Sequence, residues 1–133
     1  MLGDTTAFSS FSVDDTGAAR TFYQDVLGLE VVDGPMDGLL GVRLGSGATV
    51  MVYEKGEGHQ PASFTVLHFP VADLPGTVDA LAAKGVTFER YPDLGEIDER
   101  GIHSGQDGGP GIAWFTDPAG NVIAVLADEG LSF

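Results

Sequence analysis

The stretch Val13-Asp14-Asp15, which leads into a helical segment ending at residues 26–31 (Val-Leu-Gly-Leu-Glu-Val), has a second copy later in the chain. That copy begins at Val71-Ala72-Asp73, and its helical segment ends at residues 83–88 (Ala-Lys-Gly-Val-Thr-Phe). The order of features is the same in both copies, which indicates a chain built from two similar modules.

A second pair of stretches supports the same interpretation. Residues 47–53 and 120–126 both begin with glycine and continue as an apolar, strand-forming run. Two similar modules that face each other form a cleft, and clefts are where small-molecule sites usually lie. The sequence therefore predicts a ligand cleft between the modules.

Each module is predicted to have the order β-α-β-β-β. Asp15 can cap the first helix at its start, and Gly28 follows where a left-handed residue ends it. The expected elements of the first module are a strand at 6–13, a helix at 17–27 and strands at 29–33, 39–44 and 48–54. Those of the second are a strand at 64–71, a helix at 74–84 and strands at 86–91, 112–116 and 122–126. The first module covers about 5–55, the linker 56–62 and the second module about 63–128.

Composition limits the class of protein. With 133 residues, of which 43% are hydrophobic, the chain can form one well-cored domain but not two independent ones. No apolar run approaches the roughly 20 residues that cross a bilayer, and residues 1–4 lack the basic start of a secretory signal. The absence of cysteine excludes disulfides and thiolate metal sites. These features predict a cytoplasmic protein.

The charge balance bears on partners. Twenty acidic residues against six basic ones give a formal net charge of −14, which repels phosphate backbones and anionic membranes. Neither nucleic acid nor a membrane is therefore expected as a partner. A negative field would attract cationic ligands, although an acidic surface that keeps the protein soluble is the simpler interpretation.

Several motifs resemble those of a known family. The turn Asp117-Pro118-Ala119-Gly120-Asn121 before an apolar strand, together with Asp15, Phe22-Tyr23 and Leu27-Gly28, resembles the vicinal oxygen chelate superfamily. This group contains the glyoxalases, bleomycin-resistance proteins and extradiol dioxygenases, and the resemblance covers nearly the whole chain. It implies an α+β fold in which two βαβββ modules form a curled, incomplete β-barrel around a ligand cavity, usually in a homodimer.

The resemblance also indicates where a divalent metal would be held. The metal-ligand positions of the superfamily's metalloenzymes fall on four residues that lack ligand atoms for such an ion: Phe8, Met51, Val66 and Ala124. Hard and borderline cations need oxygen or imidazole nitrogen ligands. A shift of one residue is no better, because it substitutes Ser9, Val52, Leu67 and Val125. We therefore expect no metal cofactor.

Polar residues near these positions are candidates for ligand contact. Because side chains alternate along a strand, His68 is expected on the face of Val66, Ser10 on that of Phe8, and Tyr53 on that of Met51. Trp114 or its neighbour Phe115 could add an aromatic wall. The predicted ligand-binding set is Phe8, Ser10, Met51, Tyr53, Val66, His68, Trp114 and Ala124.

Two histidines are candidates for catalysis. His68 would suit general-base work if it met a ligand, although a lone histidine on an apolar strand is more often a hydrogen-bonded core residue. His103 lies in the glycine-rich stretch 93–111, which reads either as a lid that supplies a polar group or as a solvated acidic loop with an exposed histidine. Asp107, four residues beyond His103, does not predict a metal pair, since no helix is expected there.

Three functions are consistent with these observations. The favoured one is a metal-free protein that sequesters a small organic molecule, cationic or aromatic, as in the bleomycin-resistance branch. The alternative is a glyoxalase-like lyase or isomerase, or a dioxygenase, acting on a vicinal-oxygen substrate with His68 or His103 as base. In the third, apolar side chains fill the cavity and the protein is an interaction module, which a cavity volume would distinguish from the other two.

Overall fold

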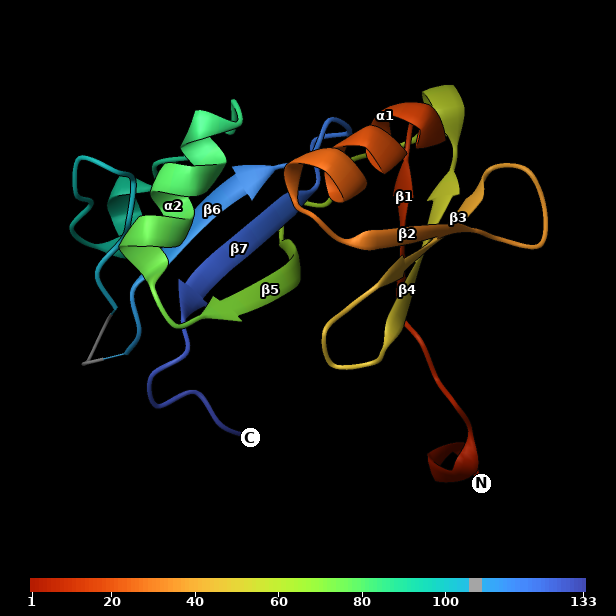
Figure 1. The fold of residues 1–133 in the computed structure, drawn as a ribbon, viewed down its shortest axis with the longest axis horizontal. Coiled ribbons are helices and arrows are strands. Elements are labelled where there is room, and N and C mark those ends of the chain that lie inside the picture. The colour runs from red at the N-terminus through yellow and green to blue at the C-terminus, as the bar shows by residue number, and fades with distance from the viewer. Residues whose placement is uncertain (106–108) are drawn as a thin grey trace. The chain divides into compact units, whose positions relative to one another are not determined.

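The computed structural model describes residues 1–105 and 109–133 (Figure 1). The chain divides into two compact units, Met1–Pro61 and Ala62–Phe133. The first contains η1 (Leu2–Asp4), β1 (Ser10–Val13), α1 (Thr16–Thr21), η2 (Phe22–Val26), β2 (Glu30–Asp33), β3 (Leu39–Arg43), β4 (Thr49–Glu54) and η3 (Gly56–Gly58). The second contains β5 (Thr65–Val71), α2 (Leu74–Ala83), η4 (Pro92–Leu94), β6 (Ile112–Thr116) and β7 (Val122–Ala127). The predicted α+β class is confirmed.

The first unit is a four-stranded sheet with a helix on one face. Its strand order is β1-β4-β3-β2, with β1 parallel to β4 and the other pairs antiparallel. Alternate residues such as Val13, Val42 and Val52 are fully buried on the helix side, where Ala19 and Tyr23 of the helical segment are also buried. Because side chains alternate in a strand, the residues between them occupy the opposite face. The predicted β-α-β-β-β order is confirmed for this unit.

The predicted helix over 17–27 has two parts. Asp15 caps it as expected, because its carboxylate accepts a hydrogen bond from the Gly17 N–H at 2.8 Å. The α-helix α1 gives way to the π-helical segment η2, in which the N–H of Leu27 donates to the carbonyl of Phe22 at 3.0 Å. Gly28 then ends the segment with a φ of 73°, the left-handed conformation that glycine adopts most easily.

The second unit is a three-stranded sheet with the order β5-β7-β6, in which β5 is parallel to β7. One face buries Ile123, Val125 and Phe115, and Leu74 and Val78 of helix α2 are buried as well. Figure 1 shows α2 alongside β6 and β7. This arrangement repeats the sheet and helix of the first unit with one strand fewer.

The prediction of a strand at 86–91 is wrong. This segment forms a single bridge between Glu89 and Trp114, in which the N–H of Glu89 donates to the carbonyl of Trp114 at 2.8 Å. The N–H of Tyr91, two residues further along the chain, donates to the imidazole of His103 instead of to a neighbouring strand. Pro92 has no N–H to offer, so the pairing cannot continue.

The turn over residues 117–121 has the structure that its sequence predicts. Asp117 is buried, and its Oδ1 accepts hydrogen bonds from the N–H groups of Ala119 and Asn121, both at 2.9 Å. Asn121, also buried, accepts a hydrogen bond through Oδ1 from the N–H of Ala62 at 3.3 Å. The turn thus connects β6 to β7 and also fixes the start of the unit.

Among the described residues, no helix is both long and apolar enough to cross a lipid bilayer.

Candidate ligand-binding site

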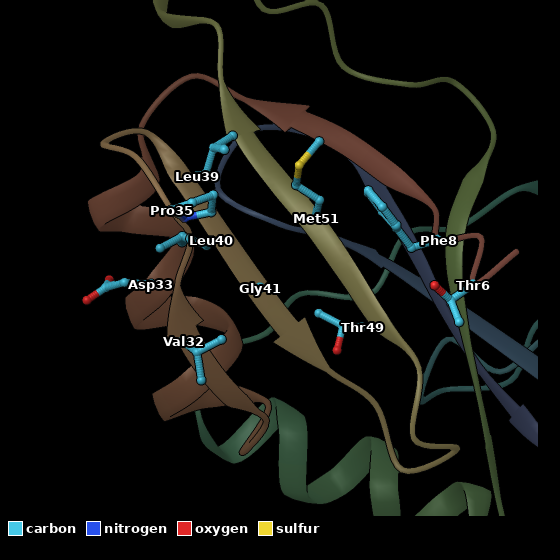
Figure 2. A pocket seen from close by; sticks show the side chains of 11 residues that line it. Thr6, Phe8, Val32, Asp33, Pro35, Leu39, Leu40, Gly41, Thr49 and Met51 are labelled. Carbon is cyan, nitrogen blue, oxygen red and sulfur yellow. The ribbon is translucent and has the colours of Figure 1, made fainter.

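The face of the first sheet that lies opposite helix α1 is hollowed. A pocket of about 360 Å³ lies there, named here the sheet pocket (Figure 2). Its apolar walls include Phe8, Val32, Pro35, Leu39 and Met51. The volume shows that the side chains of this face leave an open space, so the interpretation of a filled cavity does not hold for this unit.

Strand register explains how distant residues meet at the pocket. Met51 on β4 pairs with Gly41 on β3, which in turn pairs with Val32 on β2. A Cβ atom on Gly41 would lie 3.0 Å from Cγ2 of Val32 and 3.2 Å from Cγ2 of Thr49, closer than side chains normally pack. The missing side chain of Gly41 therefore keeps the floor of the pocket open.

The predicted residues of the first module take different places relative to this pocket. Phe8 and Met51 line it, and Phe8 is 67% exposed. Figure 2 shows the side chain of Met51 between those of Leu39 and Phe8. Ser10 pairs with Met51 and is exposed, whereas Tyr53 lies two residues beyond Met51 on β4. Of the residues that the structure describes, Ser10 and Tyr53 are outside the pocket lining.

A second, more polar pocket of about 380 Å³ lies between helix α1 and the β2–β3 connection. Arg20 of α1 forms an ion pair with Asp33 and donates a hydrogen bond through Nη1 to the carbonyl of Val31 at 3.4 Å. Asp33 borders both pockets. Its carboxylate is therefore already compensated by a guanidinium on the helix side of the sheet.

Three predicted residues of the second module lie in one row. Ala124 on β7 pairs with His68 on β5 and with Trp114 on β6, so the three share a face of the sheet. A β-bulge at Val66 interrupts the alternation along β5, and Thr65 shares the face of His68 instead. A contact with Trp114 agrees with this position of Thr65, because Nε1 of Trp114 donates a hydrogen bond to Oγ1 of Thr65 at 3.1 Å. His68 is exposed, and within the described residues its imidazole has no hydrogen-bond partner.

The interpretation of His103 as an exposed loop residue is wrong. Only 1% of His103 is exposed, and its Nε2 accepts a hydrogen bond from the N–H of Tyr91 at 2.9 Å. Nε2 is therefore unprotonated, so Nδ1 carries the proton and donates to the carbonyl of Gly101 at 3.1 Å. The ring also packs edge-on against Trp114, with centroids 4.8 Å apart. His103 thus has both nitrogens engaged in holding the loop. The pairing of His103 with Asp107 lies outside the described residues.

The phenol of Tyr91 completes this aromatic cluster. Its ring centroid lies 5.3 Å from that of Trp114 and 5.8 Å from that of His103. Burial raises the pKa of the Tyr91 phenol, and the negative charge of Glu89 raises it further. The cluster therefore favours an un-ionised phenol.

The described part of the loop that contains His103 is anchored to its own unit. Nε and Nη2 of Arg100 donate to the two carboxylate oxygens of Asp79 on helix α2, at 2.9 and 3.3 Å. Hydrogen bonding to Asp79, followed by its charge, raises the pKa of Arg100. Arg90 donates to the carbonyls of Asp98 and Glu99 at 3.0 and 3.1 Å. These contacts hold the loop against helix α2 and against the segment around Arg90 that precedes the loop.

The sequence interpretation missed several residues of the first unit. Thr6 and Thr49 line the sheet pocket, and Thr49 could have been found from its position two residues before Met51. Ser12 and His59 form a hydrogen bond between Oγ and Nδ1 at 2.8 Å. They are 47 residues apart, and His59 lies in the predicted linker, so no local signal joins them.

The four positions that the resemblance links to a metal do not fit a divalent cation. Phe8, Val66 and Ala124 offer only hydrocarbon, and Met51 offers a thioether, which suits soft ions. In residues 1–105 and 109–133, no group of three His, Asp or Glu side chains is placed to hold a metal ion.

Solved structures with the same fold cover almost the whole chain. A glyoxalase family protein from Enterococcus faecalis has a TM-score of 0.71 and 18% identity, covering 95% of this chain and 99% of the other. A lactoylglutathione lyase from Agrobacterium tumefaciens has a TM-score of 0.67 and 20% identity, covering 98% and 99%. An antibiotic binding protein from Streptomyces sp. CB03234 has a TM-score of 0.64 and 22% identity, covering 93% and 97%. At these identities, the likeness concerns the fold.

A family comparison identifies the chain more directly. A search of curated proteins gives no match. The family model described as Glyoxalase/Bleomycin resistance protein/Dioxygenase superfamily matches residues 6–125, which is most of the chain. Together with the paired β-rich units, this match shows that the chain belongs to the Glyoxalase/Bleomycin resistance protein/Dioxygenase superfamily.

Proposed function

We propose that the chain binds a small organic molecule in the sheet pocket and sequesters it without a metal and without chemical change. The sheet pocket itself is the observation that carries this proposal. Its volume of about 360 Å³ is in the range of small-molecule sites, and its walls are mainly apolar with a few polar groups. Such a lining is typical of a site that captures an apolar or aromatic compound.

The two wall residues Phe8 and Met51 support this function. Phe8 is an aromatic side chain that is 67% exposed, so a ligand that covers it would remove apolar surface from water. Met51 has a flexible, polarisable side chain that can adapt to the shape of a bound molecule. The resemblance assigns both residues to positions where the superfamily's metalloenzymes carry metal ligands, which supports a binding function without a metal.

One relative is consistent with the proposal. The protein from Streptomyces sp. CB03234 is described as an antibiotic binding protein, and it shares this fold at 22% identity. Of the two predicted classes of partner, cationic and aromatic, the apolar walls of the pocket favour an aromatic compound. The homodimer and the cytoplasmic location stay predictions, and light scattering at several protein concentrations would test the former.

A titration with N-phenyl-1-naphthylamine, an uncharged dye that fluoresces in apolar sites, tests the proposal. We expect saturable binding that Phe8→Ala weakens by about tenfold, because the lost aromatic contact is worth about 1–2 kcal/mol. Phe64→Ala is the matched control, since Phe64 is 69% exposed in the other unit. Equal binding by wild type and Phe8→Ala would place the dye elsewhere.

A separate experiment tests whether binding needs no metal. It combines elemental analysis of the protein with a thermal-shift series in Mn²⁺, Ni²⁺, Zn²⁺ and Fe²⁺. A stoichiometric metal, or an ion that stabilises the protein, would contradict the metal-free proposal.

A second function is favoured by one observation at His68. Its imidazole is exposed, has no hydrogen-bond partner in the described part of the chain, and shares a sheet face with Trp114. A free imidazole next to an aromatic side chain could act as a general base in a glyoxalase-like lyase or isomerase. Mass spectrometry of a bound compound would distinguish the two functions. Sequestration returns it unchanged, whereas an enzyme converts it, and His68→Gln would then stop the conversion without lowering affinity.

A further inference from the structure

The sheet pocket has two free hydroxyl groups in addition to its apolar walls. Thr6 and Thr49 both line the pocket and are exposed. Within the part of the chain that the structure describes, neither hydroxyl makes a hydrogen bond to another protein group. Figure 2 shows both threonines on the same side of Met51, away from Leu39 and Pro35. The pocket therefore offers two hydroxyls beside its apolar walls.

In the described part of the chain, no charged side chain is directed at the apolar walls. Among the described lining residues, Asp33 is the one with an ionisable side chain. Its side chain is 85% exposed and forms an ion pair with Arg20 of helix α1. Figure 2 shows its carboxylate pointing away from Met51. A cationic group placed against Phe8 and Met51 would lose water without gaining a counter-charge, which is unfavourable.

From this arrangement we infer that the sheet pocket selects uncharged ligands that have an aromatic or apolar body and one neutral hydrogen-bonding group, such as a hydroxyl, carbonyl or amide. The body packs on Phe8 and Met51, and the neutral group pairs with the hydroxyls of Thr6 and Thr49. A hydroxyl can donate as well as accept, so it serves each of these groups. This inference rests on the proposed function and gives the chemical class of the ligand. It differs from the expectation drawn from the net charge of −14, which favours cations.

Three naphthalene probes of nearly equal size test the inference by calorimetry. They are 2-naphthylmethanol, 2-ethylnaphthalene and 2-naphthylmethylammonium, which differ only in a terminal OH, CH₃ or NH₃⁺ group. We expect the alcohol to bind about two- to tenfold more tightly than the ethyl compound, the range for one hydrogen bond. The ammonium probe should bind more weakly than the alcohol at 0.15 and at 0.5 M salt. Salt screens the attraction between the ammonium group and the protein's overall negative charge. Comparing the two salt concentrations therefore separates this attraction from the preference of the pocket itself.

Variants locate the preference. Thr49→Val and Thr6→Val keep the side-chain shape but remove the hydroxyl, so each should reduce the ratio between alcohol and ethyl affinities towards one. Thr49→Ser retains a hydroxyl and should retain the preference. Thr87→Val is the matched control, because Thr87 is an exposed threonine of the other unit. Thermal unfolding of each variant checks that the fold is kept, and valine is well tolerated at Thr49, which lies in strand β4.

The outcomes separate the inference from the function on which it rests. Equal affinity of the wild type for alcohol and ethyl probes, or tightest binding of the ammonium probe at both salts, would overturn the inference and leave ligand binding intact. An alcohol preference that survives in Thr6→Val and Thr49→Val would also overturn it. If none of the three probes binds the wild type, the proposed function of the pocket fails as well.

Discussion

Nε2 of His103 accepts a hydrogen bond from the backbone N–H of Tyr91 at a distance of 2.9 Å. This contact takes the donor that a further strand would have used, and it places the imidazole beside the rings of Tyr91 and Trp114. The second unit therefore has an aromatic cluster and an anchored loop where the first unit has the strand β2. The contact, together with Pro92, therefore ends the strand pairing at a point where the two units differ.

Removing this imidazole should destabilise the protein. His103→Ala leaves the partly buried N–H of Tyr91 and the buried carbonyl of Gly101 without these partners and opens a cavity beside Trp114. We expect a loss of about 2–4 kcal/mol in the free energy of unfolding, measured with urea. His68→Ala, at an exposed histidine without such contacts in the described residues, should change it by less than about 0.5 kcal/mol. Similar values for the two variants would contradict the anchoring role of His103.

Alkaline pH should weaken the fold through Tyr91. Burial, with a smaller effect of Glu89, raises the pKa of its phenol in the folded state. Above the ordinary tyrosine pKa of about 10, the unfolded chain loses this proton while the folded chain still holds it, so stability falls as the pH rises. Below that pH the phenol is protonated in both states and contributes no pH dependence.

The variant Tyr91→Phe isolates this effect. The free energy of unfolding measured from pH 9 to 11.5 should fall less steeply in Tyr91→Phe than in the wild type. Tyr53→Phe, which removes a phenol from the first unit, serves as the control. Parallel pH profiles for the wild type and Tyr91→Phe would refute the assignment.

Filling the floor of the sheet pocket should block binding. In Gly41→Ala, the new methyl group would come within 3.0 Å of Val32 Cγ2 and 3.2 Å of Thr49 Cγ2, so both side chains must shift into the pocket or aside. We expect the affinity for the naphthalene probes to fall by about tenfold, with a change in stability of about 1 kcal/mol. Gly45→Ala is the control, since a Cβ there meets no atom within 4 Å. Undiminished probe affinity in Gly41→Ala would move the site away from this floor.

The turn between β6 and β7 should depend on the amide of Asn121. Asn121→Ala removes the acceptor of the Ala62 N–H and the donor to Asp117 Oδ2, which lies 3.1 Å from Nδ2. Because these groups are largely buried, we expect a loss of about 1–3 kcal/mol in the free energy of unfolding. Asn121→Asp should be at least as destabilising, since it places a second carboxylate beside Asp117. A change below about 0.5 kcal/mol in both variants would show that the turn does not need this side chain.

The sequence alone was enough to predict the order of most elements. Asp15, Gly28 and the turn at 117–121 act through hydrogen bonds and backbone conformations within a few residues, so their meaning does not depend on the rest of the fold. The alternation of apolar residues in the strands likewise fixes which face is buried. The family resemblance rests on these same local motifs.

Only the tertiary structure decided which residues line the sheet pocket together with Phe8 and Met51. Phe8, Gly41 and Met51 meet because β4 pairs with β1 on one side and β3 on the other, and the space they leave depends on a side chain that glycine lacks. The burial of His103 and its bond to Tyr91 likewise depend on where a loop folds back. Local propensities set the strands and helices, but a pocket is a volume between residues distant in sequence, and its shape follows from register and packing.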